Sequence, residues 1–166
     1  MAKRLQMREV IQKQKRGQLG GPYQRSEKYP SNTRCPKCDL LFQDGVWKRG
    51  NITNTSEHQW NLCPACLQIR DGQVGGIVQL SGTFAGSHRR ELLNRIRNVE
   101  RHTQEERPLE RIISLKEDKD GIVVSATTEH LVARIGKAVQ RDFGGNLELR
   151  YAPEDKFAFA HWHRDV

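Results

Sequence analysis

The chain has 166 residues, of which 36% are hydrophobic and 29% charged, and it carries a net charge of +8 and four cysteines. This length suits one ordinary domain or two small ones, and each small one would bury too little apolar surface without a further stabilising element such as a metal. No apolar run approaches the roughly 20 residues that cross a bilayer, and nothing resembles a secretory signal, so we expect a soluble, cytoplasmic protein.

The positive charge is concentrated in residues 1–34. This segment has nine Lys or Arg residues and two Glu residues, which accounts for +7 of the net charge of +8. It is rich in Gln and Gly, so we expect a basic, flexible arm. Such an arm is typical of a nucleic-acid binder, because each cation that neutralises a phosphate releases a counterion; the alternative is a solvated tail. The candidate phosphate contacts are Lys3, Arg4, Arg8, Lys13, Lys15, Arg16, Arg25, Lys28 and Arg34.

Two CxxC pairs, Cys35 with Cys38 and Cys63 with Cys66, carry the strongest signal in the chain. A gap of two residues lets both thiolates of a pair reach one ion at about 2.3 Å. In a reducing compartment such pairs are metal ligands rather than disulfides. Four thiolates leave no open coordination position, which favours a structural Zn²⁺ over a catalytic metal or a redox pair. We expect a zinc-ribbon domain over residues 35–82, ending in a strand at about 76–80.

The segment between the two pairs offers Trp47, Lys48 and Arg49, a ring and two cations suited to stacking on unpaired bases and holding phosphates. The alternative is that Trp47 and Trp60 form a roof over the metal site. The roof is the favoured role for Trp60, which is close to Cys63 in sequence, whereas both roles stay open for Trp47.

Residues 83–107 are predicted to form one long helix that links two domains. Ser81 or Thr83 is the expected cap, and Pro108 ends the helix. Apolar side chains recur every three or four residues, and the opposite face carries a ridge of arginines that either contacts phosphate or is solvated and paired with nearby glutamates. The apolar face comprises Phe84, His88, Leu92, Ile96 and Val99, and the ridge comprises Arg90, Arg97 and Arg101.

Residues 108–166 are predicted to form a small α+β domain with the order strand, strand, helix, strand, strand. A hairpin is expected at 111–117 and 122–126, and further strands at 147–151 and 156–162. The helix at 129–143 has Thr127 or Thr128 as its cap and two glycines, 144 and 145, as its stop. Its outer side carries Arg134, Lys137 and Arg141. The fold class is therefore α+β.

The last predicted strand alternates two kinds of side chain. An aromatic row on a sheet suits base stacking, but it is also expected of a strand packed under a helix, and the second role is favoured. Two histidines in the row suit a second metal, yet no third ligand is apparent, so they stay unassigned. One side carries Phe157, Phe159, His161 and His163, and the other carries Ala158, Ala160 and Trp162.

Catalytic signatures are absent from the sequence: it has no P-loop, dinucleotide fingerprint, serine elbow or HExxH. We therefore expect a protein that is not an enzyme, and we expect no small-molecule substrate.

Several motifs together resemble a small bacterial family of zinc-ribbon proteins. They are CPxC, LCPACLQIRDG at 62–72, LSGTF at 80–84, RNVE at 97–100 and TTEHLVARIGKAV at 127–139. The resemblance covers about residues 30–164. That family is in turn similar, through the CxxC pairs and the TTxHLxxRIG segment, to the front part of the nonsense-mediated-decay-three proteins, which are adaptors of the large ribosomal subunit. Those adaptors have more CxxC pairs and later domains that this chain lacks, so the resemblance implies ribosomal RNA or large-subunit contact but no export role.

The function expected from these features is binding, without catalysis, to the ribosome. The expected partner is ribosomal RNA, with the large subunit preferred, in assembly, quality control or stress silencing. The rival is a protein-interaction or transcription-linked regulatory zinc ribbon, for which the arm is incidental. A DNA binder without sequence preference lies between the two, and a thiol redox switch is the weakest alternative.

Overall fold

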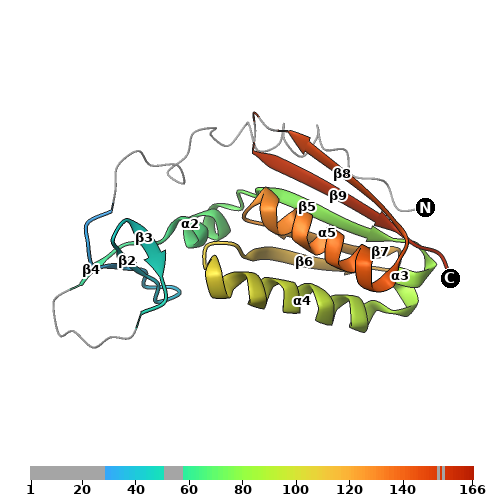
Figure 1. Cartoon of the computed structure of the whole chain (residues 1–166), viewed down its shortest axis with the longest axis horizontal. Coiled ribbons are helices and arrows are strands. Elements are labelled where there is room, and N and C mark those ends of the chain that lie inside the picture. The colour runs from blue at the N-terminus through green and yellow to red at the C-terminus, as the bar shows by residue number, and fades with distance from the viewer. Residues whose placement is uncertain (1–28, 51–57, 153, 155) are drawn as a thin grey trace.

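The computed structural model describes residues 29–50, 58–152, 154 and 156–166 (Figure 1). The basic residues predicted to contact phosphate between Lys3 and Lys28 lie outside the described residues. The described chain is mixed α and β, as predicted, and contains two sheets. In this part of the chain no helix is both long enough and apolar enough to cross a membrane.

The first sheet belongs to a small unit, residues 29–50 and 58–72, that we call the cysteine module. Its strand order is β3-β2-β1-β4. Strands β2 and β3 form a hairpin through Asp44 and Gly45, which have φ values of 53° and 79°. Two successive residues with positive φ are what a tight hairpin turn requires. The strands are β1 (Thr33–Arg34), β2 (Leu41–Gln43), β3 (Val46–Lys48) and β4 (Gln59–Trp60), and helix α2 (Pro64–Asp71) follows them.

An aromatic cluster fills the cysteine module beside the cysteines. The ring of Trp47 lies 5.0 Å from that of Tyr29 and 5.4 Å from that of Phe42, measured between centroids. Since Tyr29 packs into this core and β1 is an inner strand of the sheet, the module begins before residue 34. The predicted boundary between arm and ribbon at residue 34 is therefore corrected to a position before Tyr29.

The second sheet and three helices form the body of the protein, residues 75–166. The strand order is β6-β7-β5-β9-β8, and the neighbours β5 and β9 are parallel whereas the other pairs are antiparallel. The strands are β5 (Gly76–Ser81), β6 (Ile112–Asp118), β7 (Gly121–Ala126), β8 (Asn146–Ala152) and β9 (Phe157–His163), and the helices are α3 (Thr83–Ser87), α4 (Arg89–Glu106) and α5 (Glu129–Phe143).

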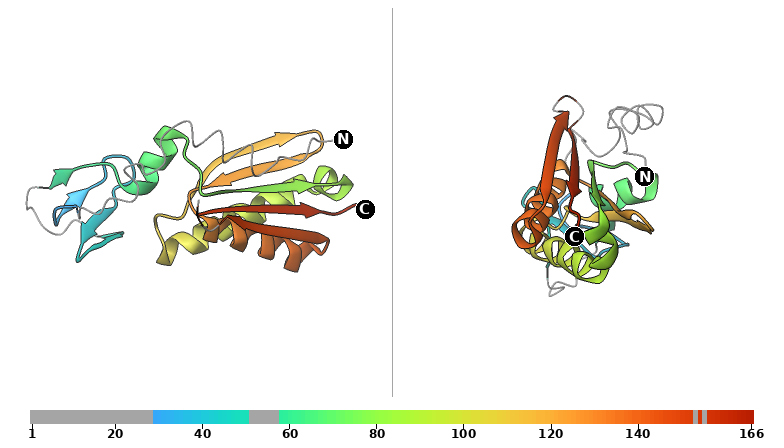
Figure 2. Two further views of the ribbon diagram at one scale, coloured as in Figure 1. Left: turned by 90° about the horizontal axis from the view of Figure 1, so that it is seen from above. Right: turned by 90° about the vertical axis from the view of Figure 1, so that its right-hand side faces the viewer.

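Helices α4 and α5 lie side by side on one face of this sheet (Figures 1 and 2). Leu92 and Ile96 of α4 and Leu131 and Ile135 of α5 pack on the same apolar strand residues, which makes one main core. The opposite face of the sheet carries a smaller apolar cluster built on Phe157 and Phe159, each 2% exposed. The predicted core role of the phenylalanines is thus right, but they lie on the side away from the helices.

Two predicted boundaries are wrong because a strand pairs with distant partners. Strand β5 was assigned to the ribbon, yet it is the central strand of the body, between β7 and β9. The helical segment after it does not link two domains: α4 packs against α5 as part of the body. The body therefore begins at about residue 75 rather than at residue 108.

The predicted single helix at 83–107 is interrupted at His88, which ends α3 and precedes α4. The hydroxyl of Ser87 donates to the carbonyl oxygen of Thr83 at 3.0 Å, a local bond that competes with helix continuation. The residue before α3 is Gly82, with a φ of 99°, and it gives no side-chain cap. The predicted capping by Ser81 or Thr83 is therefore wrong.

The helix predicted at 129–143 has those bounds in the structure. The Thr128 side chain accepts a hydrogen bond from the backbone N–H of Leu131 at 3.2 Å, and Gly144 ends the helix with a φ of 68°. The capping threonine, the spacing of the apolar side chains and the glycine that ends the helix are all local signals, and all three indicate the same helix.

Gly121 provides a test of the close pairing between β5 and β7. A Cβ atom at this position would overlap the backbone carbonyl of Leu80, which is held in the sheet. We expect Gly121→Ala to lower the free energy of unfolding by about 3 kcal/mol, the upper range for overpacking. The control is Gly86→Ala in α3, where a Cβ would lie in ordinary contact, 4.0 Å from the carbonyl oxygen of Lys119; it should leave stability unchanged or raise it by up to about 1 kcal/mol. Equal urea midpoints for the two variants would contradict this account.

Candidate metal centre

The four cysteines converge at the end of the module that faces the body. Their sulfur atoms all lie within 4.8 Å of one another, and Cys35, Cys63 and Cys66 are buried. None of the four is in a disulfide. They could hold a metal ion, as the spacing predicted.

The sulfur spacing fits tetrahedral coordination. A metal bound to four thiolates at about 2.3 Å places neighbouring sulfurs about 3.8 Å apart. The sulfur atoms of Cys38 and Cys63, which come from different CxxC pairs, are 3.7 Å apart. A disulfide would need about 2.05 Å. The separation between these two sulfurs is therefore compatible with a shared metal ion and too long for a disulfide.

Local backbone geometry brings each cysteine pair into place. In the first pair, the N–H of Cys35 donates to Leu40 at 2.9 Å and the N–H of Asp39 donates to Cys35 at 3.0 Å, which closes a turn around Cys38. In the second pair, Cys63 is the N-cap of α2, and its sulfur accepts the N–H of Cys66 at 3.4 Å. The start of a helix favours a thiolate because its unpaired N–H groups carry partial positive charge.

Arg111, at the start of the body's β6 segment, reaches across to the sulfurs. Its guanidinium donates to the sulfurs of Cys66 and Cys38, both at 3.2 Å, and approaches Cys63 at 3.9 Å. The same side chain donates from Nε to the carbonyl of Pro108 at 3.0 Å. This arrangement is that of an outer residue that orients metal ligands and offsets the negative charge of the thiolates.

The thiol pKa values reflect these contacts. The hydrogen bond with Cys63, and in smaller part the bonds and charge of Arg111, lower the pKa of Cys38 to about 4. The same hydrogen bond, together with burial, raises the pKa of Cys63. The nearby guanidinium of Arg111 thus favours negative charge on the Cys38 sulfur.

Sequence reasoning did not find Arg111 or helix α2. No neighbouring residue indicates a role for Arg111, because the cysteines that it contacts lie 45 and 73 positions earlier in the sequence. Pro64 directly after Cys63 is the signal that could have predicted α2, because proline is favoured in the first turn of a helix.

Three aromatic and basic assignments in the module are corrected by burial. Trp47 is 8% exposed and packed in the module core, so its ring does not face solvent as a stacking surface. Trp60, which was assigned to the roof of the metal site, is 61% exposed. Arg34 is 7% exposed, and its Nε lies 3.5 Å from the carboxylate of Asp39, so it belongs to the module rather than to a phosphate-binding arm.

The remaining predicted cations lie at the surface. Lys48 lies 3.6 Å from Asp44, and Arg49 donates to Gln104 of α4 at 3.3 Å. We call the exposed basic residues of α4 and α5 the helix-face cations, and they are Arg90, Arg97, Arg101, Arg134, Lys137 and Arg141. The two helices lie side by side, so the structure brings the two predicted groups onto one side of the body.

Comparison of the chain with protein-family models, curated proteins and solved structures finds no match.

The contacts of Arg111 predict a loss of metal affinity when its donors are removed. We expect Arg111→Met, which keeps an unbranched apolar side chain but has no N–H groups, to weaken metal binding about 10-fold to 100-fold in a chelator competition. The control is Arg107→Met: Arg107 is half exposed, and its guanidinium lies 3.4 Å from the carboxylate of Glu110. Affinity equal to wild type in Arg111→Met would show that the guanidinium does not support the site.

Proposed function

We propose that the cysteine site holds Zn²⁺ and that the metal has a structural role. Four thiolates suit a soft or borderline ion in tetrahedral geometry, and zinc is the common one. The sulfur separation of 3.7 Å supports this geometry. Four protein ligands leave no position for a substrate or water, so the metal stabilises the module instead of carrying out chemistry.

Removal of the metal should unfold the cysteine module and leave the body folded. The binding free energy of such sites is about 10 to 16 kcal/mol, and it is also folding free energy. In a Trp60→Phe background the buried indoles are Trp47 in the module and Trp162 in the body, whose Nε1–H donates to Gly144 at 2.7 Å.

Chelation, or the change Cys35→Ser, should therefore shift the Trp47 emission to longer wavelength while the thermal transition of the body persists. Readdition of Zn²⁺ should restore the emission of the chelated protein but not that of Cys35→Ser. An unchanged emission spectrum after complete metal removal would contradict a structural metal.

For the protein as a whole, we favour RNA binding as a cytoplasmic, ribosome-associated factor. The observation that carries this proposal is the set of helix-face cations. Within the described part of the chain no ion pair involves Arg90, Arg97, Arg134 or Lys137, although pairing with nearby glutamates was the alternative. Unpaired cations on two packed helices can each meet a phosphate and release a counterion.

The two helices hold these cations in a fixed arrangement. The guanidinium of Arg95 lies 2.5 Å from the carboxylate of Asp142, an ion pair that joins α4 to α5. Along α4 the positions 90 to 101 span about 16 Å at 1.5 Å per residue. A rigid basic surface of this length suits the backbone of folded RNA, and the net charge of +7 in residues 1–34 adds to the attraction.

Trp60 adds a surface for an unpaired base. Its ring is 61% exposed and lies edge-on to His58, with 6.5 Å between the centroids. An exposed indole stacks on any base and so suits single-stranded segments of RNA. Trp60 thus takes the stacking role that the sequence had offered to Trp47.

The choice of the ribosome, and of its large subunit, rests on the resemblance to the ribosome adaptors. Assembly, quality control and stress silencing are the roles that it implies. A protein-docking or transcription-linked regulatory module is the second candidate. It is favoured by the exposed apolar side chains of Val46, Trp60 and Ile69 on the cysteine module.

Co-sedimentation with separated ribosomal subunits from the host tests the proposal. The wild-type protein should be retained on the large subunit and should stay bound at high salt. A variant with alanine at Arg90, Arg97, Arg134 and Lys137 should bind more weakly and lose about 3 from the slope of log K against log salt, since each phosphate contact contributes about 0.7 to 0.9.

The matched control removes four exposed cations from other surfaces, with alanine at Arg70, Lys116, Arg150 and Lys156. It has the same net charge as the test variant and should bind more tightly than that variant. A shortened chain that lacks residues 1–28, and so keeps the module core from Tyr29, measures the contribution of the basic segment. Equal binding by the two quadruple variants, or no retention of the wild type, would favour the protein-docking candidate.

A further inference from the structure

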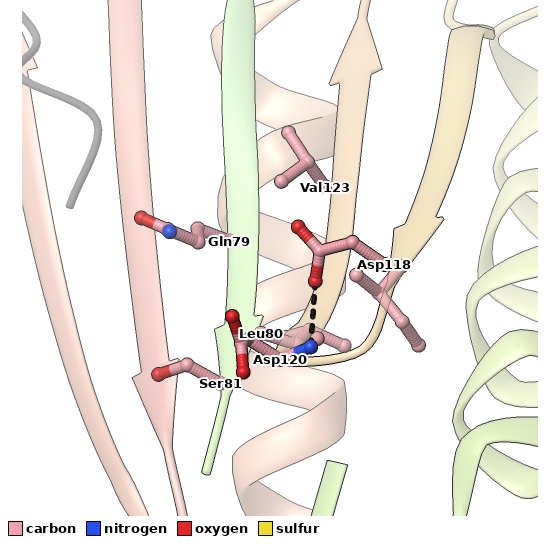
Figure 3. Close-up of a pocket in the computed structure, with 8 residues that line it drawn as sticks. Gln79, Leu80, Ser81, Asp118, Asp120 and Val123 are labelled. Carbon is pink, nitrogen blue, oxygen red and sulfur yellow. Dashed lines mark hydrogen bonds between the residues drawn. The ribbon is translucent and has the colours of Figure 1, made fainter. Parts of the chain in front are cut away.

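A hollow of about 670 Å³ lies on the sheet face away from α4 and α5, where β5 and β9 end. Figure 3 shows a separate small pocket next to this hollow, which shares Gln79, Ser81 and Asp120 with it; the side chains of Gln79 and Ser81 lie on the same side of β5. Two histidines of β9 line the hollow, because the parallel register places His161 beside Gln79 and His163 beside Ser81.

One chain of hydrogen bonds runs through this hollow. The Ser81 hydroxyl lies 3.0 Å from Nε2 of His161 and 3.0 Å from Nδ1 of His163. The Nε2 of His163 lies 3.1 Å from the carboxylate of Asp165. Each of the two facing nitrogens is 3.0 Å from the same oxygen atom, so they are at most twice that distance apart.

The carboxylate decides which nitrogens carry protons. The N–H of Thr83, and then the contact with His163, lower the pKa of Asp165, so it is an anion and only accepts. His163 therefore donates from Nε2, which leaves the Nδ1 lone pair to accept the Ser81 hydroxyl proton. Ser81 in turn accepts the Nε2 proton of His161. Both facing nitrogens are therefore hydrogen-bonded to the Ser81 hydroxyl, and a ligand that takes the place of this hydroxyl meets a lone pair on His163 and an N–H on His161.

Two further groups point to a ligand. Gln79 is 5% exposed, and its amide oxygen has no hydrogen-bond donor within the part of the chain that the structure describes. A buried acceptor without a partner is costly, and a donor from a ligand would satisfy it. Lys119 also lines the hollow and brings a positive charge, beside the carboxylates of Asp120 and Asp165.

Other chemistry fits these groups less well. Among the described residues only the four cysteines have their ligand atoms close enough together for a metal. A serine nucleophile would need N–H donors for the oxyanion. The N–H groups of Thr83 and Phe84, which follow Ser81, already donate to Asp165 and to the carbonyl of Arg164.

We propose that this hollow is a site for metal-independent cleavage of single-stranded RNA. The proposal rests on the RNA binding proposed above. The two imidazoles and the lysine indicate RNA as the substrate. RNA carries its own nucleophile, the 2′-hydroxyl, next to the phosphate. An enzyme then needs to supply only a base, an acid and a cation.

The bond that forms and the bond that breaks both belong to the substrate, and the two histidines exchange the protons. Once the substrate has displaced the Ser81 hydroxyl from the two imidazoles, the 2′-hydroxyl oxygen attacks the adjacent phosphorus while Nδ1 of His163 takes the hydroxyl proton. The bond between phosphorus and O5′ breaks, and O5′ takes the Nε2 proton of protonated His161. The products are a 2′,3′-cyclic phosphate and a 5′-hydroxyl, and proton exchange with water restores both histidines. Lys119 stabilises the charge on the phosphoryl oxygens, and Ser81 and Asp165 are positioning residues.

The test compares two small substrates in the presence of a chelator of divalent ions. The first is the dinucleotide cytidylyl-(3′→5′)-adenosine, and the second is uridine 3′-(4-nitrophenyl phosphate), whose leaving group needs no proton. The full-length wild-type protein should cleave both to the cyclic phosphate and should leave the 2′-deoxy dinucleotide intact.

The histidine variants separate acid from base. His163→Ala should lower kcat/KM about 100-fold or more on both substrates, because both need a base. His161→Ala should lose about 100-fold on the dinucleotide but less than about 10-fold on the activated substrate. Lys119→Ala should lose about 100-fold on both. The control is His130→Ala on α5, an exposed histidine away from the hollow, which should be unchanged.

The proposal is overturned if the wild type shows no cleavage above buffer, if a divalent ion is required, or if His161→Ala and His163→Ala purified in the same way retain full activity, as a contaminating ribonuclease would. These results do not depend on ribosome co-sedimentation. Loss of cleavage with intact ribosome binding would leave the proposed function standing, and cleavage without ribosome binding would remove only the ribosomal role.

Discussion

The contact between the Arg111 guanidinium and the cysteine sulfurs is the constraint on which the arrangement of the protein depends. Arg111 belongs to the body, and the sulfurs that it contacts belong to the cysteine module. A second contact joins the two units: the side chain of Gln68 in α2 donates to the carbonyl of Thr127 at 3.0 Å. The Thr127 hydroxyl accepts the backbone N–H of Arg111 at 2.9 Å. The cysteine cluster, which could hold a metal ion, is therefore part of the junction between the two units.

The body separates two kinds of surface. The helices place unpaired cations on one side, whereas the opposite face of the sheet holds imidazoles, a hydroxyl and an amide around a hollow. A strand alternates its side chains between the two faces, so Trp162 fills the core below the helices while His161 and His163 face the other way. Substitutions on the two faces therefore separate the proposed RNA binding from the proposed cleavage.

The elements that sequence reasoning predicted well are those defined by nearby residues. The helix at Glu129–Phe143 has its capping residue, its apolar spacing and its terminal glycine within or next to the segment. The CxxC spacing of the cysteines likewise indicates their cluster without help from distant residues. Features set by distant partners were missed. Strand β5 pairs with a strand about 80 residues later, and the burial of Trp47 depends on Tyr29 and Phe42 rather than on closeness to a cysteine. Arg111 has no local mark, because its role comes from sulfur atoms in another unit.

The parallel pairing of β5 with β9 has a consequence for the order of folding during synthesis. The cysteine module is complete once residue 72 has been made, and its contacts are mostly close in sequence. The body sheet, in contrast, lacks a partner for one side of its central strand until residues 157–163 have left the ribosome. Contacts between distant residues slow folding, because a long loop must close before they stabilise the chain. The nascent chain therefore passes through a stage in which a complete cysteine module precedes an open sheet with an unpaired edge, the kind of edge that recruits other strands and that a cell must protect until synthesis ends.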